Sequence, residues 1–290
     1  MKIAILTCSQ LPDLNLTDQP LIAALAKHNI TAIPMVWDEP KTNWTDFDFL
    51  IFRNTWDYFE KEAQFNSWLD QIEKSGIKTL NSIAIIKQNK HKFYLQEMER
   101  QGVRILPTIF VNKTAALNLE GLLPSHWKKA VIKPAFSAGS YLTEVFDTNQ
   151  LGPISKKYSE IASDKELLLQ EFMREIQTLG ETSFIFFNKR FSHAVNKKPV
   201  DGDFRIQVQF GGIYTLIHPD SHLIAQAQKI VDRFPDDLLY ARVDGILINE
   251  QLHLMEVECI EPDLYLQLSQ GALDRFAESI VEQIAQSNSI

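Results

Sequence analysis

The chain is poor in the residues that several common classes of protein require. It has only two cysteines, Cys8 and Cys259, which lie far apart and form no CxxC pair. Neither a disulfide framework nor a cysteine-ligated metal is therefore expected. No apolar run approaches about 20 residues, so no segment is expected to span a membrane. The N-terminal segment MKIAILTC gives way at once to polar residues, which argues against a signal peptide and favours the cytoplasm.

The chain has little positive charge compared with proteins that bind nucleic acid. The 290 residues include 29 Lys and Arg against 37 Asp and Glu, a formal net charge of −8, without a Lys/Arg-rich run. Binding to a phosphate backbone requires a basic surface, so nucleic acid is not expected as the main partner. The sequence also contains neither GxGxxG nor a Walker A motif. The two commonest nucleotide-binding loops are therefore excluded, although a local basic pocket for a nucleotide is not.

The first 84 residues have the pattern of a small α/β domain. The content of hydrophobic residues is 45% and that of charged residues 23%, which is ordinary for a soluble protein with a real core. Apolar strands that alternate with helices indicate a parallel sheet. The expected strands are 2–8, 30–37 and 47–53, and the expected helices are 19–28 and 60–75.

The rest of the chain favours an α+β region built in two lobes, 85–173 and 174–290, with a hinge near 170–176. Antiparallel sets of strands covered by helices indicate this arrangement. The expected helices are 89–102, 153–163, 219–233 and 270–286. The expected strands are 103–111, 130–134, 141–146, 167–173, 182–188, 191–196 and 204–210, followed by a hairpin.

One loop of the first domain combines a charge, an amide and two aromatic rings directly after an apolar strand. Ligands of parallel α/β sheets bind beyond the carboxyl ends of the strands, where this loop belongs. We therefore expect a substrate-recognition loop. The alternative is a solvated turn with one aromatic ring tucked into the core. The candidate substrate residues are Arg53, Asn54, Trp56, Asp57 and Tyr58.

A lysine inside an apolar strand marks a second candidate site. Lys133 in VIKPAFSAGS is followed by the small-residue loop 137–140. A buried lysine needs a negative partner, and small residues let main-chain amides approach a phosphate. The alternative is a hairpin whose lysine extends to solvent.

Two further basic residues are weaker candidates. Lys92 is expected on a helix beside Lys90, where a solvated helix face is the simpler interpretation. Arg205 stands among alternating apolar residues and is expected to face a pocket together with Arg242. Surface arginines are common, so this pair alone carries little weight.

The segment VDGILINEQLHLMEVE predicts two apolar strands around the polar turn 249–251. Folding the hairpin about this turn would place Ile248 opposite Leu252. Farther from the turn, it would place Asp244 opposite Glu256, with facing Cβ atoms roughly 4.5–5.5 Å apart.

Side chains alternate along a strand, so Glu258 would share the face of Glu256, and Arg242 that of Asp244. Like charges placed opposite each other are destabilising. Three carboxylates fit a hard cation such as Mg²⁺. We therefore expect Asp244, Glu256 and Glu258 to repel one another until a divalent cation neutralises them. The alternative is two exposed acidic strands with the register shifted by one, which would scatter the carboxylates.

The order of these features resembles a known family. Lys92, Lys133 before its small-residue loop, QEFM at a hinge, GETS, GDFR, and ARVD followed by LMEVE are similar to motifs of the ATP-grasp superfamily of carboxylate–amine ligases. The resemblance covers essentially the whole chain. It is nearest to the branch of bacterial glutathione synthetase, the ribosomal-protein glutamate ligases and the ligase that closes the ring of D-cycloserine. The implied fold is an α/β N-terminal domain followed by an α+β ATP-grasp fold whose two lobes clasp ATP.

The resemblance implies roles for particular residues. Lys92 and Lys133 would hold the α- and β-phosphates of ATP, the main chain of 170–173 would contact adenine, and Glu181 would bind the ribose. The full set of implied ATP-binding residues is Lys92, Lys133, Ser137, Gly139, Ser140, Gln170, Glu171, Phe172, Met173 and Glu181.

The implied metal ligands are Asp244, Glu256 and Glu258, which would hold two Mg²⁺ ions, with Mn²⁺ as an alternative. Arg205 and Arg242 would be catalytic, stabilising charge on the transferred phosphoryl group. One departure stands out, because many members of the family have asparagine where this chain has Glu258.

The implied activity joins a small-molecule carboxylate to an amine, or another nitrogen nucleophile, through an acyl phosphate, and releases ADP and phosphate. An intramolecular ligase that closes a ring is one alternative. A catalytically inactive nucleotide-binding regulatory protein, in which Glu258 prevents the chemistry, is another. The sequence identifies neither the acid nor the amine, and it leaves a homodimer open.

Overall fold

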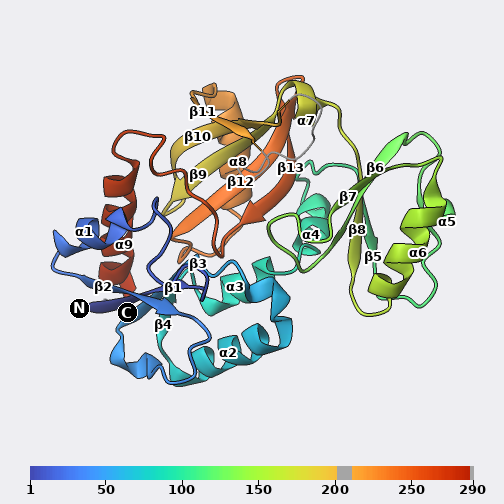
Figure 1. Cartoon of the computed structure of the whole chain (residues 1–290). Helices are drawn as coiled ribbons and strands as arrows, with labels where there is room; N and C mark the ends of the chain where they lie inside the picture. Colours follow the sequence, from blue (N-terminus) through green and yellow to red (C-terminus); the bar gives the residue numbers. More distant parts are fainter. Residues whose placement is uncertain (201–210, 288–290) are drawn as a thin grey trace.

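The computed structural model describes residues 1–200 and 211–287, and its described strands form three sheets (Figure 1). Each sheet draws its strands from a separate stretch of the chain. The predicted strand 204–210 and Arg205 lie outside the described residues. The predicted division into three domain ranges remains an interpretation.

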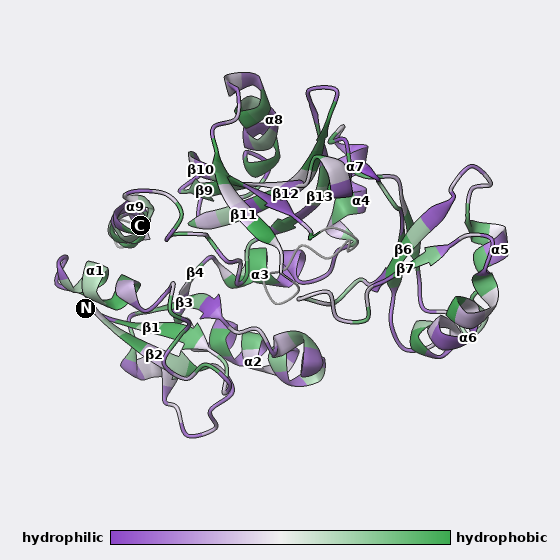
Figure 2. Ribbon diagram, turned by 45° about the horizontal axis from the view of Figure 1, so that its top comes forward, coloured by the Kyte–Doolittle hydropathy of each residue, from purple (hydrophilic) through white to green (hydrophobic). Residues whose placement is uncertain are grey.

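The N-terminal sheet is parallel, with strand order β2-β1-β3-β4. Its strands are apolar because helices cover both faces, and β1 and β2 are accordingly green in Figure 2. The elements are β1 (Lys2–Thr7), α1 (Pro20–Ala26), β2 (Thr31–Val36), β3 (Phe49–Asn54), α2 (Glu62–Ser75) and β4 (Lys78–Leu80). Helix α2 buries Phe65, Trp68, Leu69 and Ile72, the spacing of one helical face. It ends at Gly76, whose φ of 74° suits glycine.

The next sheet is antiparallel, with strand order β5-β8-β6-β7, and it forms the green lobe of Figure 1. Helix α6 packs through Tyr158 and Ala162 on Ala130 and Ile132 of the sheet. The elements are β5 (Thr108–Val111), α5 (Leu119–Leu122), β6 (Lys129–Pro134), β7 (Glu144–Asp147), α6 (Leu151–Ala162) and β8 (Leu167–Glu171).

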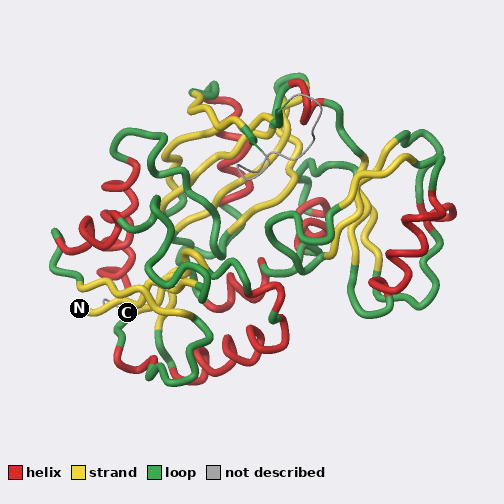
Figure 3. Tube along the Cα trace, in the orientation of Figure 1, coloured by secondary structure: helices red, strands yellow, loops and turns green. Residues whose placement is uncertain are grey.

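The largest described sheet is antiparallel, with strand order β11-β10-β9-β12-β13. Its long strands cross the upper half of the molecule in the tube view (Figure 3). Helix α8 packs on one face through Ala227 and Val231. The elements are α7 (Glu175–Thr178), β9 (Glu181–Phe187), β10 (Arg190–Lys198), β11 (Ile213–Ile217), α8 (Ser221–Val231), β12 (Tyr240–Ile248) and β13 (Gln251–Glu258).

The single helix predicted at 89–102 is wrong in its boundaries. The chain forms two short helices, α3 (Ile83–Asn89) and α4 (Tyr94–Arg100), separated by a turn. Ser82 caps α3 by accepting a hydrogen bond from the amide of Ile85. Lys92 lies in the turn and not on a helix, because its amide donates to the carbonyl of Ala135 at 2.8 Å. A tertiary contact therefore interrupts a segment of helical composition.

Helix α9 (Ala272–Ser287) returns to the start of the chain. Its residues Phe276 and Ile280 share one core cluster with Ile3 of β1 and Leu25 of α1. The two ends of the chain accordingly lie close together in Figure 1. The same cluster includes Phe187 of β9, so α9 joins the N-terminal sheet to the largest sheet.

No described helix has the length and apolar character needed to cross a membrane.

Candidate active site

A cavity of about 610 Å³ is lined by residues from the N-terminal region and from both antiparallel sheets. Its size falls within the range of about 300–1,000 Å³ that is usual for small-molecule sites. The lining includes the loop 56–59, strands β6 and β8, the ends of β9 and β10, the hairpin β12–β13, and the loop 260–265. All ten predicted ATP-binding residues line this one cavity: Lys92, Lys133, Ser137, Gly139, Ser140, Gln170, Glu171, Phe172, Met173 and Glu181.

The hairpin β12–β13 does not have the predicted turn. The turn has two residues, Asn249 and Glu250, whose φ angles of 49° and 62° are both positive, as a type I′ turn requires. Ile248 therefore pairs with Gln251 and not with Leu252 as predicted. This difference shifts the register by one residue near the tip.

A β-bulge restores the predicted register farther from the turn. Gly245 pairs with Leu254 while Asp244 pairs with Glu256, so Met255 is an extra residue in β13. Glycine is required at 245, because a Cβ there would lie 2.5 Å from the carbonyl oxygen of His253.

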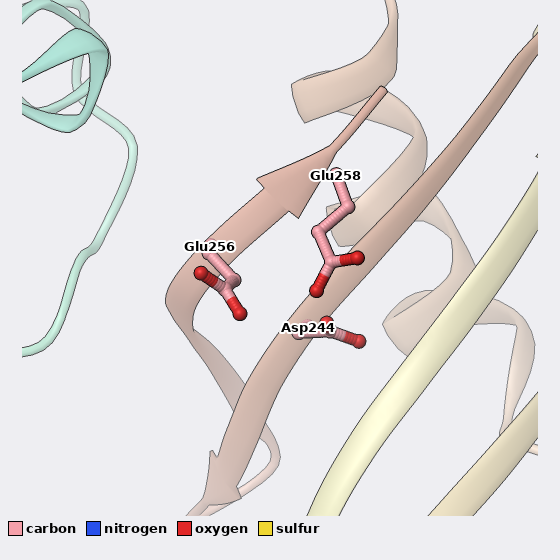
Figure 4. Close-up of side chains that lie close together, drawn as sticks. All are labelled: Asp244, Glu256 and Glu258. Atoms are coloured by element: carbon pink, nitrogen blue, oxygen red, sulfur yellow. The ribbon is translucent and has the colours of Figure 1, made fainter. Parts of the chain in front are cut away.

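The bulge brings the three predicted carboxylates together, as Figure 4 shows. Oxygen atoms of Asp244, Glu256 and Glu258 all lie within 4.8 Å of one another. Three carboxylates at this separation form a donor set that suits a divalent cation with oxygen preference. The predicted convergence of these side chains is thus observed.

The expectation that this patch is uncompensated without metal is wrong. Arg242 forms ion pairs with both Asp244, at 2.8 Å, and Glu258. The hydroxyl of Ser183 also donates to Asp244, and the ammonium of Lys197 lies 3.5 Å from its Oδ1. Burial alone would raise the pKa of Asp244, but Arg242 and Lys197 outweigh burial and hold this pKa below its usual value. The protein therefore offsets much of the like-charge repulsion itself.

Lys197 is a buried cation of the site that the sequence analysis missed. It lies on β10, which continues to Lys198, and forms an ion pair with Glu181. Apolar alternation before this point stops at Val195, so the predicted strand 191–196 ends one residue before the lysine. Burial would lower the pKa of Lys197, but Asp244 and Glu181 raise it well above its usual value. One signal for Lys197 was available in the sequence, because a glutamate such as Glu181 needs a cationic partner if it is buried.

Lys92 and Lys133 line the same cavity as the carboxylates. The ammonium of Lys92 lies 3.8 Å from Oε2 of Glu256 and donates to the carbonyl of Ser137. Lys133 lies on β6 just before the small-residue loop. Gly139 and Ser140 of this loop both have positive φ, 58° and 63°, so the chain turns sharply there.

The hinge strand β8 contributes Gln170 and Glu171 to the cavity lining. The amides of Glu171 and Phe172 donate to the carbonyls of Pro107 and Lys129, each at 3.0 Å. The side chain of Gln170 donates to Thr108 at 3.0 Å. These donors are engaged within the protein. A ligand at the hinge would therefore contact other main-chain groups of 170–173.

The structure places three of the five candidate substrate residues away from the cavity lining. Arg53 is buried and pairs with Asp18 at 2.9 Å, and it also donates to the carbonyl of Pro262. Asn54 is buried as well and donates to the same Asp18 carboxylate at 2.8 Å. Arg53 and Asn54 therefore tie the end of β3 to the segments that contain Asp18 and Pro262.

Asp57 is likewise internal, accepting a hydrogen bond from the indole of Trp37 at 2.7 Å and pairing with Lys61. The expectation that Arg53, Asn54 and Asp57 meet the substrate does not match their positions. Polar composition after a strand did not distinguish buried structural partners from ligand contacts. Trp56 and Tyr58 do line the cavity.

The loop after β13 adds acidic and aromatic residues to which the sequence analysis assigned no role. Glu261, Asp263 and Tyr265 line the cavity. Burial raises the pKa of Glu261 to about 7. The ring of Tyr265 lies beneath both Lys197 and Arg242, at 5.9 and 5.5 Å from their charged groups.

Residues 3–81 match a family described as the N-terminal domain of the D-cycloserine synthetase DcsG. The cycloserine biosynthesis protein DcsG of Streptomyces lavendulae is 23% identical, over 91% of this chain and 93% of the relative. A crystal structure of D-cycloserine synthetase DcsG superimposes with a TM-score of 0.84 and 22% identity, covering 98% of this chain and 99% of the other.

Two further solved structures extend the likeness. One is a D-alanine–D-alanine ligase from Bacillus anthracis in complex with ATP, with a TM-score of 0.72 and 16% identity over 100% and 99% of the two chains. The other is a RimK-domain ATP-grasp protein from Sphaerobacter thermophilus, with a TM-score of 0.68 and 13% identity over 98% and 99%. The chain has the ATP-grasp fold. The predicted fold class and the resemblance to ATP-grasp ligases are thereby confirmed.

Proposed function

We propose that this protein is an ATP-dependent ligase that joins a carboxylate to an amine, or another nitrogen nucleophile, and forms ADP. The observation that carries the proposal is the placement of Lys92 and Lys133 opposite three clustered carboxylates in one cavity of an ATP-grasp fold. Lysines contact phosphates, and clustered carboxylates hold the cation that accompanies them.

The nucleotide would lie with its adenine at the hinge 170–173 and its phosphates near Lys92 and Lys133. Glu181 is the candidate for the ribose hydroxyls. Lys197 forms an ion pair with Glu181 in this cavity. It would add positive charge beside the phosphates. The loop 137–140 would cover the phosphates with main-chain amides and hydroxyls.

The carboxylates Asp244, Glu256 and Glu258 fit Mg²⁺, and we propose two ions, with Mn²⁺ as a substitute. Such ions neutralise phosphate charge during phosphoryl transfer. Arg242 would stabilise the transferred phosphoryl group once its ion pairs with Asp244 and Glu258 rearrange, and Arg205 remains a candidate for the same role.

The reaction that we propose has two steps. A substrate carboxylate oxygen attacks the γ-phosphorus of ATP, and the bond to ADP breaks to give an acyl phosphate. The nitrogen lone pair then attacks the acyl carbon, a C–N bond forms, phosphate leaves with the electrons of the C–O bond, and the nitrogen loses a proton to solvent. Positioning and electrostatics suffice for both steps, so no covalent protein intermediate is required.

A ring-closing ligase is the second candidate. The similarity to DcsG over most of both chains favours it. In that case the acid and the nitrogen nucleophile belong to one molecule, and ADP would form without an added amine. A regulatory protein without turnover would bind nucleotide but form no ADP with any substrate.

The test is a thermal shift with Mg²⁺ and a nonhydrolysable ATP analogue. We expect stabilisation, about 2.7 kcal/mol at a ligand concentration 100 times the dissociation constant. Lys133→Met should remove it, whereas Lys129→Met, an exposed residue of the same strand, should not. Absence of a shift in the parent protein at millimolar analogue would refute the proposal. ADP release with panels of acids and amines then separates the three activities.

A further inference from the structure

Tyr265, in the loop after β13, is held in a main-chain conformation that bulky residues disfavour. Its φ is 50°, in the left-handed region. Its amide donates to Oδ1 of Asp263 at 2.9 Å, and its carbonyl accepts from the amide of Leu268 at 3.0 Å. Such a conformation persists only where the surroundings fix it, and it is typical of functional sites.

Side chains from across the fold fix the segment that leads to Tyr265. Six consecutive main-chain carbonyls, 259–264, each accept a hydrogen bond from a different side chain, over 2.7–3.1 Å. In the order of the acceptors, the donors are Asn81, Tyr240, Trp56, Arg53, Arg242 and His193. A segment held at every residue is preorganised, so Tyr265 is presented to the cavity in a fixed position.

The ring of Tyr265 lies beneath two cations that share one carboxylate. Nζ of Lys197 is 5.9 Å and the guanidinium carbon of Arg242 is 5.5 Å from the ring centroid. Lys197 lies 3.5 Å and Arg242 2.8 Å from oxygens of Asp244. Like charges gathered there repel each other, whereas the negative face of an aromatic ring attracts both. Tyr214 of β11 packs edge-on against Tyr265, with ring centroids 5.3 Å apart, which limits movement of the ring.

The contact with Tyr265 gains importance when a divalent cation binds. A metal ion held by Asp244 and Glu258 would compete with Arg242 for their oxygens. The arginine would then retain the carbonyl of Asp263, at 3.1 Å, and the face of the ring. A metal ion with oxygen preference does not compete for an aromatic face. The ring is therefore a partner that keeps the cations in place while the carboxylates turn to the metal.

We propose that Tyr265 is a positioning residue that holds Lys197 and Arg242 for the γ-phosphate of ATP. The inference rests on the proposed ligase function, in which Arg242 stabilises the transferred phosphoryl group. Tyr265 acts through the two cations by its ring face, so phenylalanine can replace it and an aliphatic side chain cannot. Its loss should affect a triphosphate far more than a diphosphate, which lacks the group that the cations face.

The experiment compares the dissociation constants of ADP and of the nonhydrolysable ATP analogue, both with Mg²⁺, by calorimetric titration. We expect the parent protein to bind the analogue more tightly. Tyr265→Leu should reduce this preference about tenfold and leave the affinity for ADP within about twofold, because a desolvated cation–π contact is lost. Tyr265→Phe should keep the parental preference.

Fluorination separates the charge distribution of the ring from its shape. Pentafluorophenylalanine at position 265 keeps a ring of similar size and reverses the sign of its face, so the preference should fall as in Tyr265→Leu. This variant also decides the matter if Tyr265→Leu does not fold. Phe276→Leu is the structural control, because Phe276 belongs to the same core cluster as Tyr265 and is not part of the cavity lining. It should lower the melting temperature and keep the parental preference.

The inference is overturned if Tyr265→Leu or the fluorinated ring keeps the parental preference, if both ligands weaken equally, or if Phe276→Leu loses the preference as well. A parent protein that binds ADP and the analogue with equal affinity would also overturn it, because the cations would then not face a γ-phosphate. Absence of any nucleotide binding by the parent protein is a different result, which contradicts the proposed ligase function itself.

Discussion

Arg242 and Asp244, two residues apart on β12, are joined by three hydrogen bonds. Nε of the arginine lies 3.1 and 2.9 Å from the two carboxylate oxygens, and Nη2 lies 2.8 Å from Oδ2. Arg242 also pairs with Glu258. The candidate metal site therefore already contains a fixed positive charge, and a divalent cation would compete with it for the same oxygens.

Replacing Arg242 by methionine should destabilise the protein strongly. The change leaves buried Asp244 with less compensation, and breaking a buried pair in this way costs about 3–5 kcal/mol. Added Mg²⁺ should recover part of this loss, because the three carboxylates would then bind it more tightly. Chemical denaturation with and without Mg²⁺ measures both effects. Arg100→Met, which removes an exposed pair with Glu97, is the control and should show a much smaller loss.

Glu256→Gln should affect the nucleotide response far more than the free protein. Among the described residues, Glu256 pairs with Lys92 at 3.8 Å, and both side chains are partly exposed, so the free energy of unfolding should change by about 1 kcal/mol or less. The gain in melting temperature from the Mg-bound ATP analogue should shrink, because a candidate metal ligand is lost. Glu144→Gln, whose partner Lys157 lies outside the cavity, is the control. A destabilised variant with an intact nucleotide response would rule out Glu256 as a metal ligand.

Arg53→Ala should impair folding and not nucleotide recognition. The substitution leaves Asp18 buried beside Asn54 without its cation, a change that costs about 3–5 kcal/mol. The shift caused by the Mg-bound analogue should remain, because Arg53 is not part of the cavity lining. Denaturation and thermal shift on the same sample decide this. If the variant kept parental stability but lost ligase turnover, Arg53 would return as a substrate contact.

His193 should make the stability depend on pH below neutrality. Its Nε2–H donates to the carbonyl of Leu264 at 2.9 Å, and burial lowers its pKa to about 4. The unfolded chain therefore binds the proton first as the pH falls. The contribution is fully present above about pH 6.5 and is lost progressively down to about pH 4, by about 3 kcal/mol in total.

The variant His193→Gln should show a flatter dependence of unfolding free energy on pH across this window. His28→Gln, which changes an exposed histidine, should retain the parental slope. Equal slopes for the parent and His193→Gln would show that the ring does not resist protonation in the folded state.

The sequence predicted the ATP-grasp fold and the meeting of Asp244, Glu256 and Glu258, but the hairpin reached that arrangement by a different route. The two-residue turn moved the register by one, and the extra residue Met255 moved it back. Alternation of side chains cannot reveal two deviations that cancel. The observed pairing depends on the positive φ angles of the turn and on the close approach of the partner strand at Gly245, and both arise only in the folded hairpin.

The buried ion pairs were harder to predict. Arg53, Asn54 and Lys197 looked like loop or surface residues, because their partners Asp18 and Glu181 are distant in sequence. Propensity and periodicity describe local preference, whereas a buried charge is fixed by contacts that only the assembled fold provides. Lys92 illustrates the same limit, since its tertiary bond to Ala135 ends a helix that composition favours.

The position of α9 has a consequence for synthesis of the protein. The N-terminal sheet leaves the ribosome long before Phe276, Ile280 and Ile284 of α9, which cover one of its faces. Until they arrive, Ile3, Ile5 and Leu25 lack part of their cover, and the nascent domain exposes an apolar surface. Completion of the first domain thus waits for α9, so folding of this domain depends on a helix that is made after both antiparallel sheets.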